Sequence, residues 1–294
     1  MARHVITESK LRARRRKQRA LLIYISIVLA IAATTGLVFL LRADFMRIHT
    51  ITVTGNTTVP TADITQRVSD TISGNALFVL PKDDILLYSK RSIIENIYQA
   101  FPAVRSVSVE ATSFSSIAVK IEEQQPAAEW CGATAPTFSG AASSAASSTP
   151  TVAANCFLMN SDGLVYAPAP QFSQDPYVPF YGTLAGEGVQ LPQQFLSPAA
   201  VHSLLALIPA LSQEVNGAHV RAAAILTDEI DAEANVYFSN GFSVDFLLKD
   251  DAGVVLDHFT SALSSSAFQG HTTADFEYLD LRFGDTLYYK LRAH

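Results

Sequence analysis

The chain lacks the short motifs that mark the commonest active sites. Neither Gly-x-Ser-x-Gly, His-Glu-x-x-His, Gly-x-x-x-x-Gly-Lys-Ser/Thr nor Gly-x-Gly-x-x-Gly occurs in its 294 residues. Its seven histidines are scattered without the spacing of metal ligands. Two pairs of adjacent carboxylates, Asp83-Asp84 and Asp250-Asp251, resemble helix N-terminal charges more than an acid–base pair, because neighbouring side chains on a helix do not face each other. We therefore expect a protein that is not an enzyme and that uses no cofactor, metal ion or small-molecule substrate.

Excess positive charge is confined to the start of the chain. Eight Lys and Arg against one Glu give residues 1–41 a charge of +7. Because the net charge of the whole chain is −6, the other 253 residues carry −13. An acidic domain repels phosphates, which excludes a nucleic-acid partner. At 253 residues this part is long enough for two domains, each with its own core.

An uncharged stretch of 22 residues, Ala20 to Leu41, follows the basic leader 1–19. As a helix it would be about 33 Å long, enough to cross a bilayer. The positive-inside rule keeps the leader in the cytoplasm and places everything after Leu41 outside it. A cleaved signal peptide is the alternative, since Ala30-Ile31-Ala32 resembles a cleavage site. The apolar run continues for nine residues beyond Ala32, which favours an uncleaved anchor.

Residues 45–125 show the pattern of a small α+β domain. Alternation predicts strands at 48–54, 104–110 and 116–122. A helical stripe at Ile64, Val68 and Ile72 predicts one helix, and a second is expected from Asp83 or Asp84 to Phe101. The resulting order is β-α-α-β-β.

This order, together with three phrases, resembles a POTRA domain. The phrases are Phe45-Met46-Arg47-Ile48-His49-Thr50-Ile51-Thr52-Val53-Thr54-Gly55-Asn56, Phe101-Pro102-Ala103-Val104-Arg105-Ser106-Val107 and Ile117-Ala118-Val119-Lys120-Ile121-Glu122-Glu123-Gln124-Gln125-Pro126-Ala127-Ala128.

The two cysteines, Cys131 and Cys156, flank a low-complexity insertion at 132–154 that is dominated by Ala, Ser and Thr. Both follow the predicted anchor, in a compartment where disulfides persist. We interpret them as a structural disulfide across the base of the insertion, with two unpaired thiols as the alternative. A redox-active pair would have Cys-x-x-Cys spacing, which is absent.

Residues 126–294 predict a second α+β domain on a mostly antiparallel sheet. A hairpin is expected at 157–166, a loop at 176–191, and a helix capped by Ser197-Pro198. Strands at 221–227, 234–239 and 242–248 precede a helix around Phe259. The chain closes with strands at 276–283 and 286–291.

The closing hairpin carries a second resemblance. Tyr278-Leu279-Asp280-Leu281-Arg282-Phe283 is similar to the Tyr-Val-Asp-Leu-Arg-Tyr/Phe signature of the bacterial cell-division family FtsQ, called DivIB in some bacteria. The Pro-Ala-Ala-Glu-Trp segment and the Asp162-Gly163 hairpin extend the similarity along the chain, in order, from Met1 to His294. The insertion 132–154 and the segment Val244–Leu248 depart from the family pattern.

The same hairpin is the candidate binding site. An edge strand offers backbone groups that a partner strand can complete, and no later element of the sequence covers 286–291. Alternation puts Tyr288 and Tyr289 on opposite faces. The alternative role for Phe283 is that of an ordinary core residue. By resemblance, the expected partner-binding residues are Arg282, Phe283, Asp285, Leu287, Tyr288, Tyr289 and Leu291.

The resemblance implies a non-enzymatic divisome scaffold in the cytoplasmic membrane at the division septum. It implies binding to small bitopic proteins of the FtsB and FtsL type in support of septal peptidoglycan synthesis, with FtsK-, FtsW- and FtsI-type proteins as further candidates. A membrane-anchored POTRA protein that guides secreted polypeptides is the second interpretation. A wall-processing enzyme with an unfamiliar site is the third.

Overall fold

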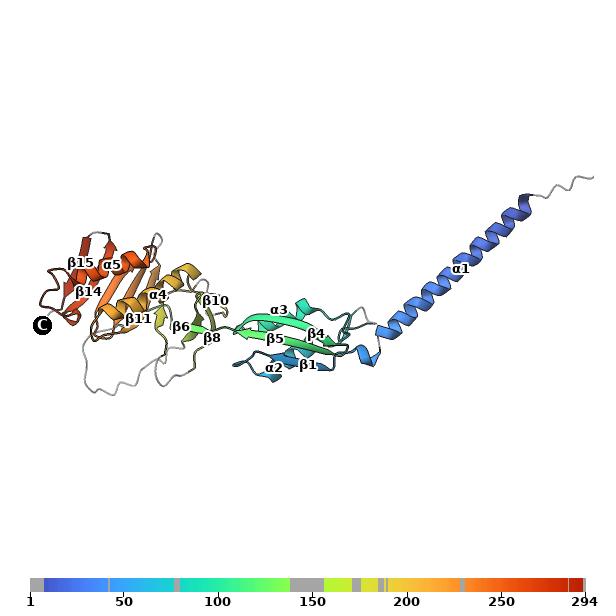
Figure 1. Ribbon diagram of the computed structural model, residues 1–294, viewed down its shortest axis with the longest axis horizontal. Coiled ribbons are helices and arrows are strands. Elements are labelled where there is room, and N and C mark those ends of the chain that lie inside the picture. Colours follow the sequence, from blue (N-terminus) through green and yellow to red (C-terminus); the bar gives the residue numbers. More distant parts are fainter. Residues whose placement is uncertain are drawn as a thin grey trace, which may run out of the picture. The chain divides into compact units, whose positions relative to one another are not determined.

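A computed structural model describes residues 8–41, 43–76, 80–137, 156–170, 176–184, 188, 190–227, 231–284 and 286–292 (Figure 1). The chain divides into two compact units, Met1–Glu123 (unit 1) and Gln124–His294 (unit 2). Each unit has its own hydrophobic core, and together they make an α+β protein.

A single long helix, α1 (Glu8–Leu41), begins the described chain. Its segment Lys17–Gly36 is the one stretch of the described residues that is long and apolar enough, as a helix, to cross a membrane. The 20 residues of this segment span about 30 Å, the thickness of a bilayer core. Helical structure continues beyond Gly36 to Leu41, where the sequence is still apolar.

The rest of unit 1 packs two helices against a three-stranded sheet. A short 3-10 turn, η1 (Asp44–Met46), leads into β1 (Thr50–Thr54) and α2 (Thr61–Ile72). The two-residue strands β2 (Asn75–Ala76) and β3 (Leu80–Pro81) precede α3 (Lys90–Ala100). Strands β4 (Val104–Ser113) and β5 (Ser116–Glu123) complete the sheet, in which β5 lies between β1, parallel to it, and β4, antiparallel to it.

Side-chain periodicity explains the core of unit 1. The apolar stripe of α2 is buried at Ile64, Val68 and Ile72. The alternating residues of β5 on the same side are Ile117, Val119 and Ile121, each at most 2% exposed. Ile93 and Ile97 of α3 complete the cluster.

The expected start of the second helix at Asp83 or Asp84 was wrong. The helix α3 begins at Lys90, and Ser89 caps it by accepting a hydrogen bond from the Ser92 N–H. Residues 83–85 instead lie beside residues 46–48, where the Ile85 N–H donates to the Met46 carbonyl and the Ile48 N–H donates to the Asp83 carbonyl. The adjacent acids are therefore not helix N-terminal charges. Asp83 pairs with Arg47 at 2.7 Å, and the buried Asp84 accepts from the Leu86 N–H.

Glu123, the last residue of β5, holds the loop between β1 and α2. Its carboxylate accepts hydrogen bonds of 2.8–3.0 Å from the N–H groups of Thr57, Thr58 and Val59, and one from the Thr57 hydroxyl. Burial by itself would raise the pKa of Glu123, but these hydrogen bonds outweigh it and lower the pKa to about 2. The ionised carboxylate thus stabilises unit 1.

Replacement of Glu123 by Gln should weaken unit 1 and make it less sensitive to acid. The folded pKa of about 2 lies below the ordinary 4.5, so the stabilisation is complete above pH 4.5 and is lost as the pH falls toward 2. We expect Glu123→Gln to lower the free energy of unfolding at pH 7 by about 1–2 kcal/mol. The effect is no larger because the carboxylate is partly exposed and solvent screens its charge.

Circular dichroism melts between pH 2 and pH 7 measure both effects. Glu122→Gln, an exposed neighbour on the same strand, is the control and should keep the wild-type acid profile. A Glu123→Gln variant as acid-sensitive as the wild type would contradict the assignment.

Unit 2 is built on a ten-stranded sheet with the order β10-β8-β7-β6-β9-β11-β12-β13-β14-β15. Most neighbours are antiparallel, and the parallel pairs are β6 with β9, β9 with β11, and β13 with β14. The strands are β6 (Pro126–Trp130), β7 (Phe157–Asn160), β8 (Leu164–Pro168), β9 (Pro179–Tyr181), β10 (Gln193–Gln194), β11 (Val220–Thr227), β12 (Ala232–Phe238), β13 (Ser243–Leu247), β14 (Phe276–Phe283) and β15 (Thr286–Leu291).

Two helices, α4 (Pro198–Glu214) and α5 (Ala252–Leu263), pack against one face of this sheet (Figure 1). Ser197 caps α4 and Asp251 caps α5 through their side-chain oxygens. A 3-10 turn, η2 (Thr273–Asp275), precedes β14. The core residues of the last strands are Val236, Phe238, Val244, Phe246, Leu279 and Leu281. Their alternation leaves the polar residues of the same strands on the opposite face.

The prediction of a loop throughout 176–191 was wrong in one place. Strand β9 lies within this segment and pairs in parallel with both β6 and β11. Phe180 at its centre is fully buried against the core. A three-residue strand is too short to show alternation in the sequence. It is recognised only by its pairing with β6 and β11, which are distant in the sequence.

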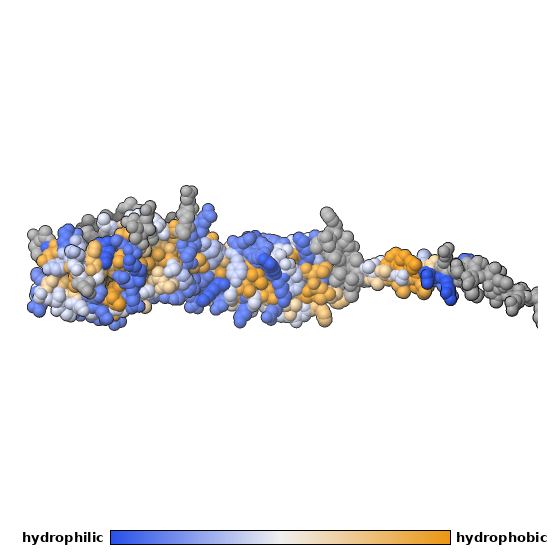
Figure 2. All heavy atoms as spheres, turned by 90° about the horizontal axis from the view of Figure 1, so that it is seen from above, coloured by the Kyte–Doolittle hydropathy of each residue, from blue (hydrophilic) through white to orange (hydrophobic). Residues whose placement is uncertain are grey.

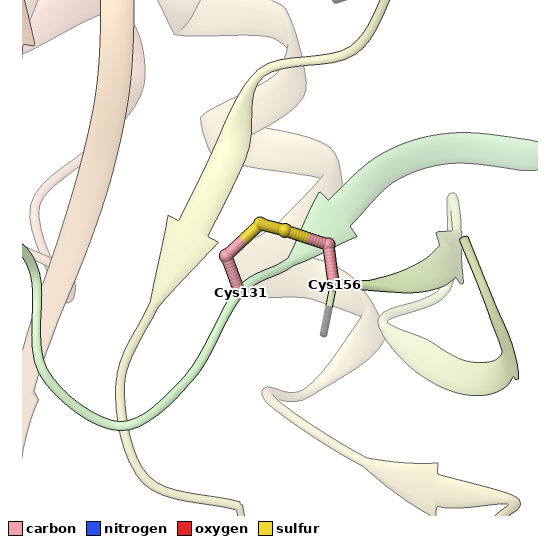
Figure 3. Close-up of a disulfide and its surroundings, with 2 residues drawn as sticks. All are labelled: Cys131 and Cys156. Carbon is pink, nitrogen blue, oxygen red and sulfur yellow. A yellow bond between two sulfur atoms is a disulfide. The ribbon is translucent and has the colours of Figure 1, made fainter. Parts of the chain in front are cut away.

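Cys131, directly after β6, and Cys156, directly before β7, form a disulfide (Figure 3). Their Cα atoms are 4.2 Å apart, and the pairing of β6 with β7 brings the two residues together. Of the insertion 132–154 between them, residues 138–154 lie outside the described part of the chain.

Removal of this disulfide should destabilise unit 2. It closes a loop between residues 25 positions apart, which corresponds to about 3–4 kcal/mol in the chain-entropy model. The double variant Cys131→Ser, Cys156→Ser should unfold at lower urea concentration than the wild type, and a reducing agent should shift only the wild type.

The emission of Trp130, the single tryptophan, is a local readout, because its buried indole N–H donates to the Gly182 carbonyl beside the disulfide. An unfolding midpoint that is the same in the wild type with and without reductant would count against a stabilising role.

Candidate functional site

The last strand of the chain, β15, forms one edge of the large sheet. It pairs with β14 on one side, and no described strand pairs with its other side. Five of its six residues are exposed. Such an edge leaves backbone N–H and C=O groups that an added strand can satisfy.

The other sheet edges among the described residues differ from β15 in their side chains. The opposite edge of the large sheet, β10, has only two residues, Gln193 and Gln194. The edge strands of unit 1, β1 and β4, carry none of the large exposed apolar side chains. At β15 and the end of β14 four such side chains occur together, namely Phe283, Tyr288, Tyr289 and Leu291.

Phe283 and Tyr288 form an aromatic pair on the surface. Their ring centroids are 5.1 Å apart in an edge-to-face arrangement, and the Arg282 guanidinium carbon lies 5.7 Å from the Phe283 centroid. A shift in the pairing register between Asp280 and Phe283 interrupts the alternation that buries Leu279 and Leu281. Phe283 is 57% exposed and is therefore not an ordinary core residue.

The opposite face of β15 attaches the strand to unit 2. Tyr289 lies edge-on to Phe276 at 5.7 Å and near Phe268 at 6.3 Å, while part of its ring stays exposed. Leu287 packs against the core of the unit. The edge strand is thus held by one face and open on the other.

Arg282 links strands β14 and β12 across β13. Its guanidinium donates to both carboxylate oxygens of Asp280, at 2.8 and 2.6 Å, and also to Glu233. The hydrogen bond to Asp280 is the main reason that the pKa of Arg282 is raised above its ordinary value. Burial opposes the ionisation of Asp280, but the hydrogen bonds from Arg282 outweigh it and hold the pKa of Asp280 below its ordinary value.

A row of polar residues crosses the helix-free face of the sheet toward β15. Asn235, Asp245, Asp280 and Tyr288 occupy paired positions on β12, β13, β14 and β15. Burial, followed by the negative charge of Asp280, raises the pKa of Asp245 to about 7. One oxygen of Asp245 is buried without a hydrogen-bond partner among the described residues, which favours the protonated carboxyl.

The expected site residues fall into three groups. Phe283, Tyr288, Tyr289 and Leu291 are exposed at the edge, whereas Leu287 and Arg282 are partly buried and engaged within unit 2. Asp285 lies outside the described residues. Of the expected membrane anchor, Ala20 is exposed on α1 and Leu41 is its last residue.

The sequence interpretation missed the row of polar residues that leads to β15. Glu233 and Asp245 had no assigned role, although a carboxylate between the apolar residues Val244 and Phe246 is a signal of a polar face. One group of potential metal ligands, Glu129 with Cys131 and Cys156, lies within the described residues. Both of its sulfur atoms belong to the disulfide and are not available as thiolates.

No protein-family model matches this chain, and no curated protein matches it either. The interpretation of the edge therefore depends on its own geometry.

Asp245 should make unit 2 less stable as the pH rises. Because the folded pKa of about 7 lies above the ordinary 3.8, the folded state holds a proton that the unfolded state has released, so stability falls between pH 4 and pH 7. Asp245→Asn should remove most of this loss, and we expect a relative gain on the order of 2 kcal/mol at pH 8 compared with pH 5.

Urea unfolding of the wild type and the variant at pH 5 and pH 8 gives the four free energies needed. Asp257→Asn, at an exposed position on α5, is the control and should leave the pH dependence unchanged. Equal pH dependence in the wild type and Asp245→Asn would show that Asp245 does not hold the proton.

Proposed function

We propose that this chain is a membrane-anchored, non-enzymatic scaffold of the FtsQ/DivIB type that binds partner proteins by adding a strand to β15. The observation that carries the proposal is the edge position of β15, with exposed Phe283, Tyr288 and Leu291 beside an unpaired strand side. Main-chain pairing would supply affinity, and the aromatic side chains would supply specificity.

The arrangement of unit 1 supports the POTRA part of the proposal. Between α1 and Glu123, the main elements run β1, α2, α3, β4 and β5, in the β-α-α-β-β order typical of that domain. The short hairpin of β2 and β3 is inserted between the helices. Helix α1 would anchor the protein in the cytoplasmic membrane, and the basic residues before it would remain in the cytoplasm.

The chemistry of the edge favours an extended, partly apolar peptide as the partner. Phe283 and Tyr288 offer an aromatic surface, and Lys290 is paired with Glu277 on the neighbouring strand. Small bitopic proteins of the FtsB and FtsL type are the proposed partners, at the division septum and in support of septal peptidoglycan synthesis. FtsK-, FtsW- and FtsI-type proteins are further candidates.

Replacement of Phe283 by Asp tests this function. The full chain, in lipid nanodiscs, is used to capture the host's FtsB- and FtsL-like proteins. We expect Phe283→Asp to weaken capture by about tenfold or more, because a charge would replace an apolar side chain at the centre of the contact. Its fold should remain intact, since Phe283 is exposed.

Leu226→Asp is the matched control, because Leu226 is an equally exposed apolar residue of the same sheet, on β11. It should bind like the wild type. Amide hydrogen exchange adds a direct readout, since strand addition should slow exchange in 286–291. Capture that is lost in both variants, or absent in the wild type, would contradict the proposal and favour a role in guiding secreted polypeptides.

A further inference from the structure

A second apolar surface lies in the folded part of unit 1, at the end of its three-stranded sheet where the chain enters from α1. It consists of four large side chains that are between 40% and 70% exposed, namely Phe45, Leu86, Leu87 and Phe114. They come from three separate segments, η1, the turns before α3, and the β4–β5 turn. We call them the proximal apolar surface. None of them contributes to the core of unit 1.

Backbone hydrogen bonds hold these three segments at one end of the sheet. The Ile85 N–H donates to the Met46 carbonyl at 2.9 Å, and the Ile48 N–H donates to the Asp83 carbonyl at 2.8 Å. The Ser115 carbonyl accepts from the N–H groups of His49 and Thr50. Figure 2 shows hydrophobic surface at this end of the unit.

The proximal apolar surface is tied to α1 by a very short connection. Helix α1 ends at Leu41 and η1 begins at Asp44, three residues later, a distance of at most about 11 Å for an extended chain. The apolar sequence of α1 continues to its last residue. If the apolar residues 20–41 of α1 span the membrane, Asp44 is at most about 11 Å from the hydrocarbon core, so η1 and the segments bonded to it lie within or next to the headgroup layer, which is about 5–8 Å thick on each side.

We propose that the proximal apolar surface docks onto the lipid bilayer in which α1 is anchored. The occupant is the membrane interface, because the short connection holds lipid beside this surface permanently and at high effective concentration. Phe and Leu are suited to the boundary between headgroups and acyl chains. Close to this surface, Arg47 pairs with Asp83 at 2.7 Å, and the Asp44 carboxylate lies 3.8 Å from His49. The contact would restrict how unit 1 tilts on its anchor.

This inference rests on the membrane anchoring in the proposed function but not on any protein partner. Binding at β15 could fail while lipid contact remains, and the reverse is equally possible. The two are therefore tested separately.

Tryptophan substitution at Phe114 tests the contact. The full-length Phe114→Trp variant is reconstituted in vesicles whose lipids carry bromine atoms on the acyl chains, which quench nearby indoles. We expect quenching of the added emission by about twofold, with a blue shift, because the indole would enter the interface. Phe114 is 69 residues beyond Phe45 in sequence, so the connection to α1 alone would not bring it to the lipid.

Tyr98→Trp is the matched control. Tyr98 is an exposed aromatic residue of α3 whose hydroxyl bonds the Arg105 carbonyl near the start of β4. This is the opposite end of the sheet, since the β4–β5 turn contains Phe114. Its emission should not be quenched. The native Trp130, buried in unit 2, contributes the same background to every variant and is subtracted.

A combined variant asks whether the surface acts as a whole. Leu86→Asp with Leu87→Asp in the Phe114→Trp background should reduce the quenching toward the control value, with circular dichroism unchanged because both side chains are exposed. Vesicle flotation is measured first. Protein that floats but shows equal emission for Phe114→Trp and Tyr98→Trp would overturn the lipid contact alone. Protein that does not float would overturn the anchor and the lipid contact together.

Discussion

A strand inside a sheet pairs its backbone N–H and C=O groups with a neighbour on each side, whereas an edge strand leaves one side to solvent or to a partner. In unit 2 every described strand of the large sheet has two strand neighbours except β10 and β15 at its edges. The candidate site depends on this constraint. Edge strand β10 has two residues, whereas β15 has six and adjoins a group of exposed aromatic side chains. The sheet thus ends in one minimal edge and one extended edge.

Side-chain packing explains why the extended edge stays in place. Helices α4 and α5 cover one face of the sheet, and Leu287 and Tyr289 attach β15 to that face. On the other face, Arg282 bridges β14 and β12 above the carboxylates Asp280 and Glu233. Strand β15 is therefore held through one face by Leu287 and Tyr289, and through its pairing with β14, while its outer backbone has no described neighbour. A rigid edge loses less conformational entropy when a partner strand binds.

The two proposed contacts belong to different units, each with its own core. Protein binding is assigned to the last hairpin of unit 2, and lipid binding to the proximal apolar surface of unit 1. They use the same physical principle, because in both an apolar surface that the fold cannot bury is left for something else to cover. They differ in what selects the occupant. Backbone pairing selects a strand, whereas covalent attachment to α1 selects the bilayer.

Local pattern was sufficient for the end of α1 at Leu41, for the boundaries of β14 and β15, and for the cap of α4 at Ser197, because each depends on residues adjacent in sequence. Only tertiary structure decided the start of α3, the strand β9 and the exposure of Phe283. The first two follow from hydrogen bonds to distant segments, and the third from a register shift. The pairing of Asp245 with Asp280 likewise joins strands 35 positions apart. A sequence specifies which side chains alternate, but folding determines which of them meet.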